Sequence, residues 1–380
     1  MASPDDRPVR ARDLGIPFDG TPGPLNAITD VAGVTVGHTT LIEDLAGGRA
    51  VRSGVTAILP RGRESFDKPV FAGSFVLNGN GEMTGTIWVE ESGMLEGPVM
   101  ITNTHSVGVV RDAVIQWRVS LGGADDSGYW WSLPVVAETW DGYLNDINGF
   151  HVRSEHATSA LEKAVAGPVA EGSVGGGTGM ICHEFKGGIG TASRIVTGSD
   201  GSFTLGVLVQ ANYGIRDLLR IGGVPVGQYL REQLVYTDPA LAMGGGPPPG
   251  EVGSIIIVVA TDAPLLPHQL KRIARRASMG IARNGSIASN GSGDIFIAFS
   301  TANVGAGQAG PASTVTMLTN DSMSGLFQAT VEAAEEAVIN AMVAARDMTG
   351  DRGHLVKALP HAELRDVLER FGRLVGSDKD

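Results

Sequence analysis

A serine follows a glycine at the point where a loop of glycines and prolines meets a buried strand. The loop 244–253 reads Gly-Gly-Gly-Pro-Pro-Pro-Gly-Glu-Val-Gly, and Ser254 opens the run Ser-Ile-Ile-Ile-Val-Val-Ala-Thr. Gly253 has no side chain, so a hydroxyl reaches its carbonyl carbon with little hindrance. The loop can also adopt the strained peptide geometry that an N-to-O acyl shift requires. We predict that the chain cuts itself between Gly253 and Ser254, the alternative being an ordinary serine that starts a strand.

A cut at this bond gives Ser254 an α-amino group of its own. Such a group has a pKa of about 7.7–8.0 in model peptides. It can therefore act as the general base for the neighbouring hydroxyl at neutral pH. No histidine is then needed, which agrees with a sequence that shows no obvious Ser/His/Asp triad and no Gly-x-Ser-x-Gly elbow between a strand and a helix.

A second polar cluster, Asn290-Gly-Ser292-Gly-Asp294, precedes the next expected strand. One helix separates this strand from the strand of Ser254, so we expect the two to be neighbours in one sheet. That arrangement would bring the Ser292 hydroxyl and the Asp294 carboxylate close to Ser254, where a carboxylate can orient the α-ammonium group or tune its pKa. The alternative for Asp294 is a turn residue that caps the strand.

Other kinds of site find little support. There is no Gly-x-x-x-x-Gly-Lys-Ser/Thr phosphate loop. The glycine cluster 175–179 has no convincing strand before it and no clear helix after it, so a tight turn is the better interpretation. Cys182, His183 and Glu184 are sequential neighbours whose side chains point apart on a strand, and the eight histidines do not cluster. We therefore expect no metal site.

Strands and helices alternate along the chain, which favours a layered α/β or α+β sandwich. Alternating or continuous apolar runs predict strands at Val31–Leu41, Ser53–Pro60, Val70–Leu77, Pro98–Thr102, Phe203–Ala211, Ser254–Thr261 and Ile295–Thr301. Helical spacing predicts helices at Ser106–Trp117, Ser154–Val165, His268–Arg283, Ser324–Arg346 and His361–Leu374. No repeat and no clean linker is visible, so we expect a single domain over residues 1–380.

Composition limits the partners. The 380 residues include 42% hydrophobic and 18% charged residues, which is typical of a globular chain. The net charge of −12 argues against non-specific nucleic-acid binding. No apolar stretch approaches the roughly 18 residues that span a bilayer. The N-terminus lacks the apolar region of a signal peptide, and Cys182 is the single cysteine. We expect a cytoplasmic protein without an intramolecular disulfide.

The same residues carry a resemblance to a known family. The chain resembles the DmpA-like aminopeptidases, which comprise L-aminopeptidase/D-amidase/D-esterases and β-peptidyl aminopeptidases. The matching stretches follow one another over nearly the whole chain: Arg12–Ile16, Asn26–His38, Asn78–Glu82, Val136–Asn148, Val209–Gly214, Gly253–Ile256 and Asn290–Asp294.

The resemblance implies a fold and an assembly. The expected fold is an α+β protein with a four-layer αββα sandwich, similar in its layers to N-terminal-nucleophile hydrolases but with different strand connections. Self-cleavage would yield a large subunit, 1–253, and a small subunit, 254–380, which assemble into a homotetramer of cleaved heterodimers. No metal and no organic cofactor is implied, and the expected partner is a small peptide or amino-acid amide.

The resemblance also assigns roles to single residues. Ser254 would be the nucleophile, with Ser292 and Asp294 as its polar partners. Asn212 would donate its amide to the tetrahedral oxyanion, where one donor contributes about 3 kcal/mol. Glu138 would bind the free amino group of the substrate, although on its own it is typical of a surface charge at the end of a strand.

Trp140 departs from the family pattern. It stands where a tyrosine that assists the oxyanion is expected in some members, and an indole N–H donates but cannot accept. Tyr143 is the nearest replacement. Trp130, Trp131 and Trp140 lie close together in the sequence and could shape a small apolar specificity pocket, while core packing is the alternative for the first two.

The function that these observations predict is a self-processing serine aminopeptidase or amidase. It would release N-terminal L-α-, D-alanine-type or β-amino residues through an acyl-enzyme on Ser254. Two alternatives stay open. One is an acyl transferase like ornithine acetyltransferase, against which the serine counts because those enzymes use an N-terminal threonine. The other is a non-catalytic oligomeric binding protein with the same fold.

Overall fold

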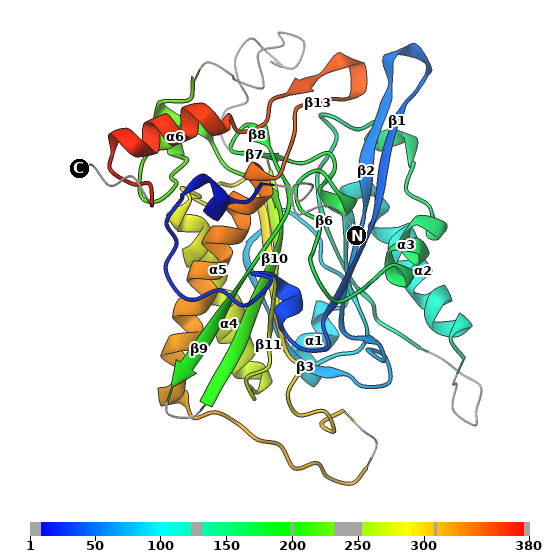
Figure 1. Ribbon diagram of the computed structural model, residues 1–380. Coiled ribbons are helices and arrows are strands. Elements are labelled where there is room, and N and C mark those ends of the chain that lie inside the picture. The colour runs from blue at the N-terminus through cyan, green and yellow to red at the C-terminus, as the bar shows by residue number, and fades with distance from the viewer. Residues whose placement is uncertain (1–8, 123–130, 199–200, 232–252, 308–309, 376–380) are drawn as a thin grey trace.

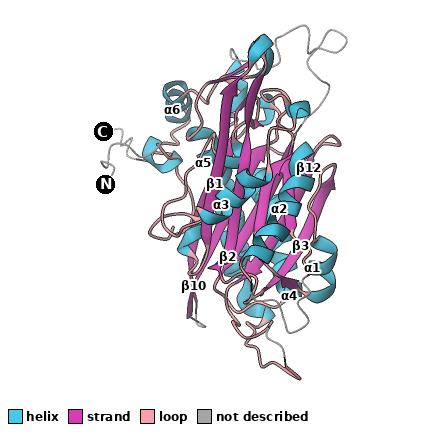
Figure 2. Ribbon diagram, turned by 90° about the vertical axis from the view of Figure 1, so that its right-hand side faces the viewer, coloured by secondary structure: helices cyan, strands magenta, loops and turns pink. Residues whose placement is uncertain are grey.

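Two β-sheets pack face to face, and each is covered on its outer side by helices. The computed structural model describes residues 9–122, 131–198, 201–231, 253–307 and 310–375. In Figure 1 the layers run from α4 and α5, through the two sheets, to α2 and α3. Figure 2 looks onto the helices α2 and α3 and the sheet behind them. The predicted four-layer αββα sandwich is confirmed.

The two sheets differ in size. The smaller sheet has the order β1-β2-β5-β6 and comprises Thr35–Asp44, Ala50–Arg63, Val99–Asn103 and Val135–Thr139. The larger sheet has the order β4-β3-β12-β11-β10-β9 and comprises Met94–Leu95, Val70–Gly79, Gly293–Ser300, Ser254–Thr261, Gly201–Asn212 and Gly188–Gly198. Two short hairpins stand apart, formed by β7 (Ile181–Cys182) with β8 (Phe185–Lys186) and by β13 (Met348–Thr349) with β14 (Leu355–Val356).

Helices cover the outer faces of both sheets. α2 (Val107–Ser120) and α3 (Ser154–Glu162) pack on the smaller sheet, while α4 (Pro267–Arg283) and α5 (Ser324–Val343) pack on the larger sheet. The remaining helices are α1 (Thr86–Ser92) and α6 (His361–Arg370). Within the described residues no helix is long and apolar enough to cross a membrane.

Strand β11 shows why its sequence is apolar without interruption. Ile255 and Ile257 belong to the core under α4 and α5, whereas Ile256 and Val258 belong to the core between the two sheets. Both faces of the strand are thus buried, as the unbroken apolar run predicts. The observed bounds, Ser254–Thr261, are those expected from the sequence.

The two segments on either side of residue 253 form one sheet. β11 and β12 are parallel neighbours joined through α4, as expected, and β3 and β10 flank them on both sides. The central strands therefore come from residues 254–380 and their neighbours from residues 1–253. A chain cut at this point would stay associated, because the sheet and its two cores require both pieces.

The structure differs from the expected elements in places. β6 and β9 were not predicted; β6 is short, and β9 contains three glycines, which weaken any strand signal. Helix α3 ends at Glu162 rather than Val165, since the backbone of Val165 exchanges hydrogen bonds with Val36 of β1 instead. The loop 244–252 lies outside the described residues.

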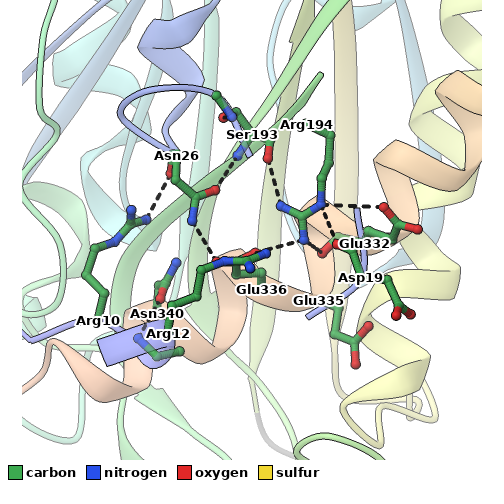
Figure 3. Close-up of polar contacts among 12 residues, drawn as sticks. Arg10, Arg12, Asp19, Asn26, Ser193, Arg194, Glu332, Glu335, Glu336 and Asn340 are labelled. Carbon is green, nitrogen blue, oxygen red and sulfur yellow. Dashed lines mark hydrogen bonds and ion pairs between the residues drawn. The ribbon is translucent and has the colours of Figure 1, made fainter. Parts of the chain in front are cut away.

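A buried ionic network ties the N-terminal segment to the larger sheet and α5 (Figure 3). The Glu336 carboxylate on α5 accepts two hydrogen bonds from the guanidinium group of Arg12, both at 2.8 Å. It also accepts hydrogen bonds from the amide of Asn26 at 2.6 Å and from Nη2 of Arg194 on β9 at 2.7 Å. The side chains of Arg194 and Glu336 are 1% and 0% exposed. Burial by itself raises the pKa of Glu336, but these bonds and positive charges outweigh it and leave the pKa below its usual value.

Glu336→Gln is expected to lower the free energy of unfolding by about 3 kcal/mol at pH 7, because it leaves the buried Arg194 without its main counter-charge. The folded-state pKa of Glu336 lies below the ordinary value of 4.5. Its stabilisation is therefore complete above that value and is lost as the pH falls through the folded-state pKa. Urea unfolding of both proteins at pH 7 and pH 4, at one protein concentration, measures the difference.

Glu332→Gln is the matched control for this prediction, since Glu332 lies 3.4 Å from Nε of Arg194 and is bonded also to Gln328. Glu332→Gln should lower the free energy of unfolding by less than Glu336→Gln does. An equal loss in the two variants, or a loss at Glu336 that does not shrink in acid, would contradict the role assigned to Glu336.

Candidate active site

Ser254 lies at the start of β11 and opens into a cavity between the two sheets. Ser254 and Ile256 are two residues apart on the strand, so their side chains lie on the same face, which is the face between the two sheets. Ser254 is 6% exposed. The cavity has a volume of about 420 Å³, and its lining residues are Asn80, Gly81, Glu82, Thr104, Glu138, Trp140, Gly253, Ser254 and Gly291. The structure therefore brings Gly253, Ser254, Glu138 and Trp140 to one cavity.

Gly253 packs directly against the neighbouring strand. A Cβ atom at this position would lie 2.0 Å from the backbone oxygen of Asn212. No other residue fits there without displacing the strand end. The glycine therefore allows β10 to approach the bond between Gly253 and Ser254 as well as leaving that bond unhindered.

The Ser254 hydroxyl accepts a backbone hydrogen bond from the adjacent strand. The N–H of Gly293 donates to Oγ of Ser254 at 3.1 Å, and the two residues are opposite each other in the parallel pair β11–β12. Gly293 is itself closely packed, since a Cβ there would lie 2.4 Å from the backbone oxygen of Asn80. An N–H in this position can stabilise negative charge that develops on Oγ.

The stretch Asn78-Gly-Asn-Gly-Glu82 fixes the turn that precedes β12. Nδ2 of Asn80 donates to the oxygen of Gly291 at 2.8 Å, and Nδ2 of Asn78 donates to the oxygen of Ala288 at 3.2 Å. Next to this clamp the register of β3 against β12 shifts between Asp294 and Ile295, which is a β-bulge. Bulges of this kind commonly re-aim groups beside active sites.

Asn212 ends β10 directly opposite Ser254. Its Oδ1 accepts the N–H of Ile181 at 2.8 Å, and its Nδ2 donates to the backbone oxygen of Trp140 at 3.0 Å. An asparagine amide carries two N–H bonds, and among the described residues only one of them is used. Asn212 is 3% exposed and is not among the residues that line the cavity.

Glu138 approaches the cavity from the opposite sheet. It is the fourth residue of β6 and only 3% exposed, so the alternative of a surface charge at a strand end was wrong. Oε1 accepts the N–H of Glu82 at 2.9 Å, and Oε2 accepts the hydroxyl of Thr104. Burial raises the pKa of Glu138, while these two hydrogen bonds oppose the shift. A cationic group would restore the charge balance of this carboxylate.

Ser292 and Asp294 are bonded to each other rather than exposed in the cavity. Oγ of Ser292 donates to Oδ1 of Asp294 at 2.6 Å, and both residues are fully buried. Asp294 is on the same face of β12 as Phe296, which is the face covered by helices. The side chain of Ser254 faces the other sheet. The pair thus approaches the start of β11 from the side opposite the Ser254 hydroxyl.

The aromatic candidates separate into two places. Trp140 lines the cavity and is 39% exposed. Tyr143 is not among the lining residues; it is buried in a small apolar cluster and stacks on His354 with ring centroids 4.4 Å apart. Trp131 is exposed and contacts Trp88 edge to face, while Trp130 lies outside the described residues.

Sequence reasoning missed Thr104 and did not assign a role to Asn80 or Gly81. Thr104 follows β5 directly, and a polar residue at the end of a buried strand is the signal that could have found it. In the glycine cluster 175–179, Gly175–Gly177 form a buried 3-10 turn between the sheets, which agrees with the tight turn expected from the sequence. No cluster of three or more His, Cys, Asp or Glu side chains that could hold a metal ion occurs in the described ranges.

Comparisons with known proteins agree with this geometry. The sequence profile of peptidase family S58 matches residues 26–356. The chain is 55% identical over 379 residues to beta-peptidyl aminopeptidase BapA of Sphingosinicella microcystinivorans, a match that covers 97% of this chain and 94% of that protein.

Two solved structures share the fold over nearly their whole length. The L-aminopeptidase D-Ala-esterase/amidase of Ochrobactrum anthropi, a prototype for the serine aminopeptidases, is 52% identical with a TM-score of 0.88, covering 96% of this chain and 99% of that one. A Burkholderia beta-aminopeptidase is 50% identical with a TM-score of 0.85, covering 98% and 100%. The first is a variant of the Ntn hydrolase fold, and the αββα sandwich described above is the same fold.

Proposed function

This chain belongs to peptidase family S58 and is a serine aminopeptidase, and we propose that it cuts itself before Ser254 and then releases N-terminal residues, β-amino residues among them. One observation carries the proposal. Ser254 and the buried carboxylate of Glu138 come from opposite sheets and line the same cavity, while Asn212 stands opposite Ser254. A nucleophile, an oxyanion donor and a binding group for an ammonium ion are thereby combined.

Self-cleavage prepares the nucleophile. Oγ of Ser254 attacks the carbonyl carbon of Gly253, the bond from that carbon to the nitrogen of Ser254 breaks, and the hydroxyl proton passes to that nitrogen. The resulting ester is hydrolysed by water, which leaves a carboxylate on Gly253 and a free α-amino group on Ser254. The two pieces stay together because β11 and β12 of the small piece lie between strands of the large piece in one sheet. By its resemblance to the family, the product is proposed to assemble as a homotetramer of cleaved heterodimers.

The free amino group is the proposed general base. It takes the proton of the Ser254 hydroxyl as Oγ attacks the substrate, then gives that proton to the leaving amine. The pair of Ser292 and Asp294, which approaches the strand start from the other side, suits a role in orienting the amino group. Water then attacks the ester on Ser254 and gives a proton to the amino group, which passes it to Oγ of Ser254. This step releases the acid and restores the enzyme.

Asn212 is the proposed oxyanion donor in both half-reactions. Each attack converts a carbonyl oxygen into an oxyanion that needs a donor close to Oγ of Ser254. The amide of Asn212 is held from both ends, at Ile181 and Trp140, so its orientation is fixed before the substrate binds. A donor that does not reorganise stabilises the transition state more than one that does.

Glu138 is the proposed anchor for the amino group of the substrate. A buried carboxylate that keeps its charge prefers a cationic partner, and an N-terminal ammonium ion supplies one. The first residue would then be held with its carbonyl beside Ser254. The beta-peptidyl relative and the Burkholderia beta-aminopeptidase support a pocket that also accepts the additional backbone methylene of a β-amino residue.

Hydrolysis of β-alanyl anilide tests this proposal. The wild-type enzyme should hydrolyse it and leave N-acetyl-β-alanyl anilide intact, because acetylation removes the charge that Glu138 binds. Glu138→Gln should raise KM for the free substrate about tenfold or more, since a hydrogen bond to a charged group contributes about 1.5–3 kcal/mol. The rate of aniline release, measured by liquid chromatography at a series of substrate concentrations, gives kcat and KM.

The pH dependence provides a second readout. Binding requires the Glu138 carboxylate, and burial raises its pKa. A plot of log kcat/KM should fall in acid with slope one from the α-amino group and then steepen to slope two below the pKa of Glu138; Glu138→Gln removes the steeper part. Glu90→Gln is the control, because the side chain of Glu90 on α1 is exposed, and this variant should behave as wild type. Equal turnover of the acetylated substrate would refute the anchor.

A further inference from the structure

A buried lysine holds together the loop that contacts Asn212. Lys186 ends β8, in the hairpin of β7 and β8, and its side chain is fully buried. Its Nζ donates to the backbone oxygens of Met180 at 2.7 Å, Gly187 at 2.9 Å and Gly177 at 3.4 Å. An ammonium group has three N–H donors and no acceptor, so three carbonyl oxygens satisfy it.

The contacts lead from this ammonium to the proposed oxyanion donor in two steps. Ile181 follows Met180 and is paired with Lys186 across the hairpin. The N–H of Ile181 donates to Oδ1 of Asn212 at 2.8 Å. An amide whose oxygen is held by Ile181 turns its Nδ2 the other way, toward the backbone oxygen of Trp140, a residue that lines the cavity. The position of Met180 thus decides the orientation of the Asn212 amide.

A neutral side chain cannot replace the ammonium group here. The carbonyl oxygens of Gly177, Met180 and Gly187 converge on Nζ of Lys186, and a residue without three donors leaves at least one of them without its side-chain donor. Burial lowers the pKa of Lys186 to about 7, so the ammonium form, which satisfies all three oxygens, is the major form below that pH. The Met180 oxygen also accepts the N–H of Gly187 at 2.8 Å, so two donors fix its direction. Without the ammonium group the carbonyl would tilt toward Gly187 alone, and the N–H of Ile181 would move with it.

We propose that Lys186 is a positioning residue for the aminopeptidase reaction, which acts by fixing the amide of Asn212 through Met180 and Ile181. The proposal rests on the role proposed for Asn212 as oxyanion donor. It requires that loss of the Lys186 ammonium lower the rate of the chemical step and leave substrate binding at Glu138 unchanged.

Arg216 provides a matched control. It is also a buried cation, 1% exposed, and it holds the same hairpin through backbone oxygens. Its guanidinium donates to the oxygens of His183 at 2.9 Å, Leu230 at 2.8 Å and Glu184. His183 and Glu184 form the turn of the hairpin, at the end away from Ile181, and Leu230 lies outside the hairpin. Arg216→Met should therefore lower thermal stability with little effect on kcat.

The test compares Lys186→Met with Arg216→Met, each as the full-length enzyme, with β-alanyl anilide as substrate. Lys186→Met should lower kcat about 10-fold to 100-fold, less than removal of an entire oxyanion donor, and change KM less than about twofold. In an Asn212→Ala background the same substitution should have no further effect on kcat. Multiplicative losses in the double variant, or a rise in KM instead of a fall in kcat, would overturn the proposal.

A crystal structure gives an answer that does not depend on activity. Lys186→Gln keeps a polar side chain with two N–H donors and serves if Lys186→Met does not fold. The distance from the Ile181 nitrogen to Oδ1 of Asn212 should lengthen beyond hydrogen-bonding range in either variant. A distance that stays near 2.8 Å would exclude the role of Lys186. Failure of the wild type to hydrolyse β-alanyl anilide would instead refute the proposed function.

Discussion

Ser254→Ala is expected to yield one uncut chain of 39.4 kDa with no measurable aminopeptidase activity. Without Oγ there is no nucleophile for the Gly253 carbonyl, so the bond stays intact and no free α-amino base forms. Loss of the nucleophile together with its base should lower kcat by a factor on the order of 10^4 to 10^6, as for serine enzymes whose catalytic groups act as a unit.

Mass spectrometry under denaturing conditions measures the cut directly. Denaturation is needed because the larger sheet contains strands from both pieces, which hold the cut protein together. The wild type should give two fragments, the smaller one beginning at Ser254. Ser278→Ala, on α4 with its hydroxyl bonded to Arg275 of the same helix, is the control and should be cut and active. A cut or active Ser254→Ala protein would disprove the role of this serine.

Asn212→Ala should lower kcat by about 10²- to 10³-fold and change KM little. The second N–H of this amide is proposed to donate to the substrate oxygen only once that oxygen has become an oxyanion, so its loss raises the barrier by about 3–4 kcal/mol without weakening the bound substrate. Kinetics with β-alanyl anilide, normalised to the fraction of cut protein, separate the two constants. The same donor serves self-cleavage, so cutting of the variant should also be slower.

Asn340 offers a closely matched control for this result. It is buried on α5, where Oδ1 accepts the N–H of Ala11 and Nδ2 donates to the oxygen of Thr191, both at 3.0 Å. Asn340→Ala thus removes the same pattern of hydrogen bonds away from the cavity. It should reduce stability and leave kcat within about twofold of wild type. A similar loss of kcat in both variants would mean that the effect of Asn212 is structural.

Strand β11 shows how much could be predicted locally. Its bounds and the burial of both its faces follow from an unbroken run of β-branched residues that starts after a glycine. The adjacency of β11 and β12 follows from one intervening helix, because a strand–helix–strand unit generally places its strands in parallel. Strand β9 could not be predicted in this way, since its glycines gain their strand geometry from packing against α5 and β10.

Charged residues show where local reasoning ended. Glu138 and Lys186 are ordinary hydrophilic residues in the sequence, yet both are buried in the structure. Their burial depends on partners such as Thr104 and Met180, which are brought to them by other elements. Tyr143 shows the opposite error, because its nearness to Trp140 in the sequence does not bring it to the cavity.

The sequence by itself predicted the bond that we propose is cut, and it determined the type of chemistry as that of a serine aminopeptidase. A glycine before a serine at a strand start, together with the motifs of a known family, needs no long-range information. Only the tertiary structure decided which groups face the cavity and which lie on the other face of the sheet. Glu138 lines the cavity with Ser254, whereas Asp294 lies on the face covered by helices. The reason is physical: the burial of a charge and the direction of a hydrogen bond are set by the packing of two sheets, which no single segment of the chain contains.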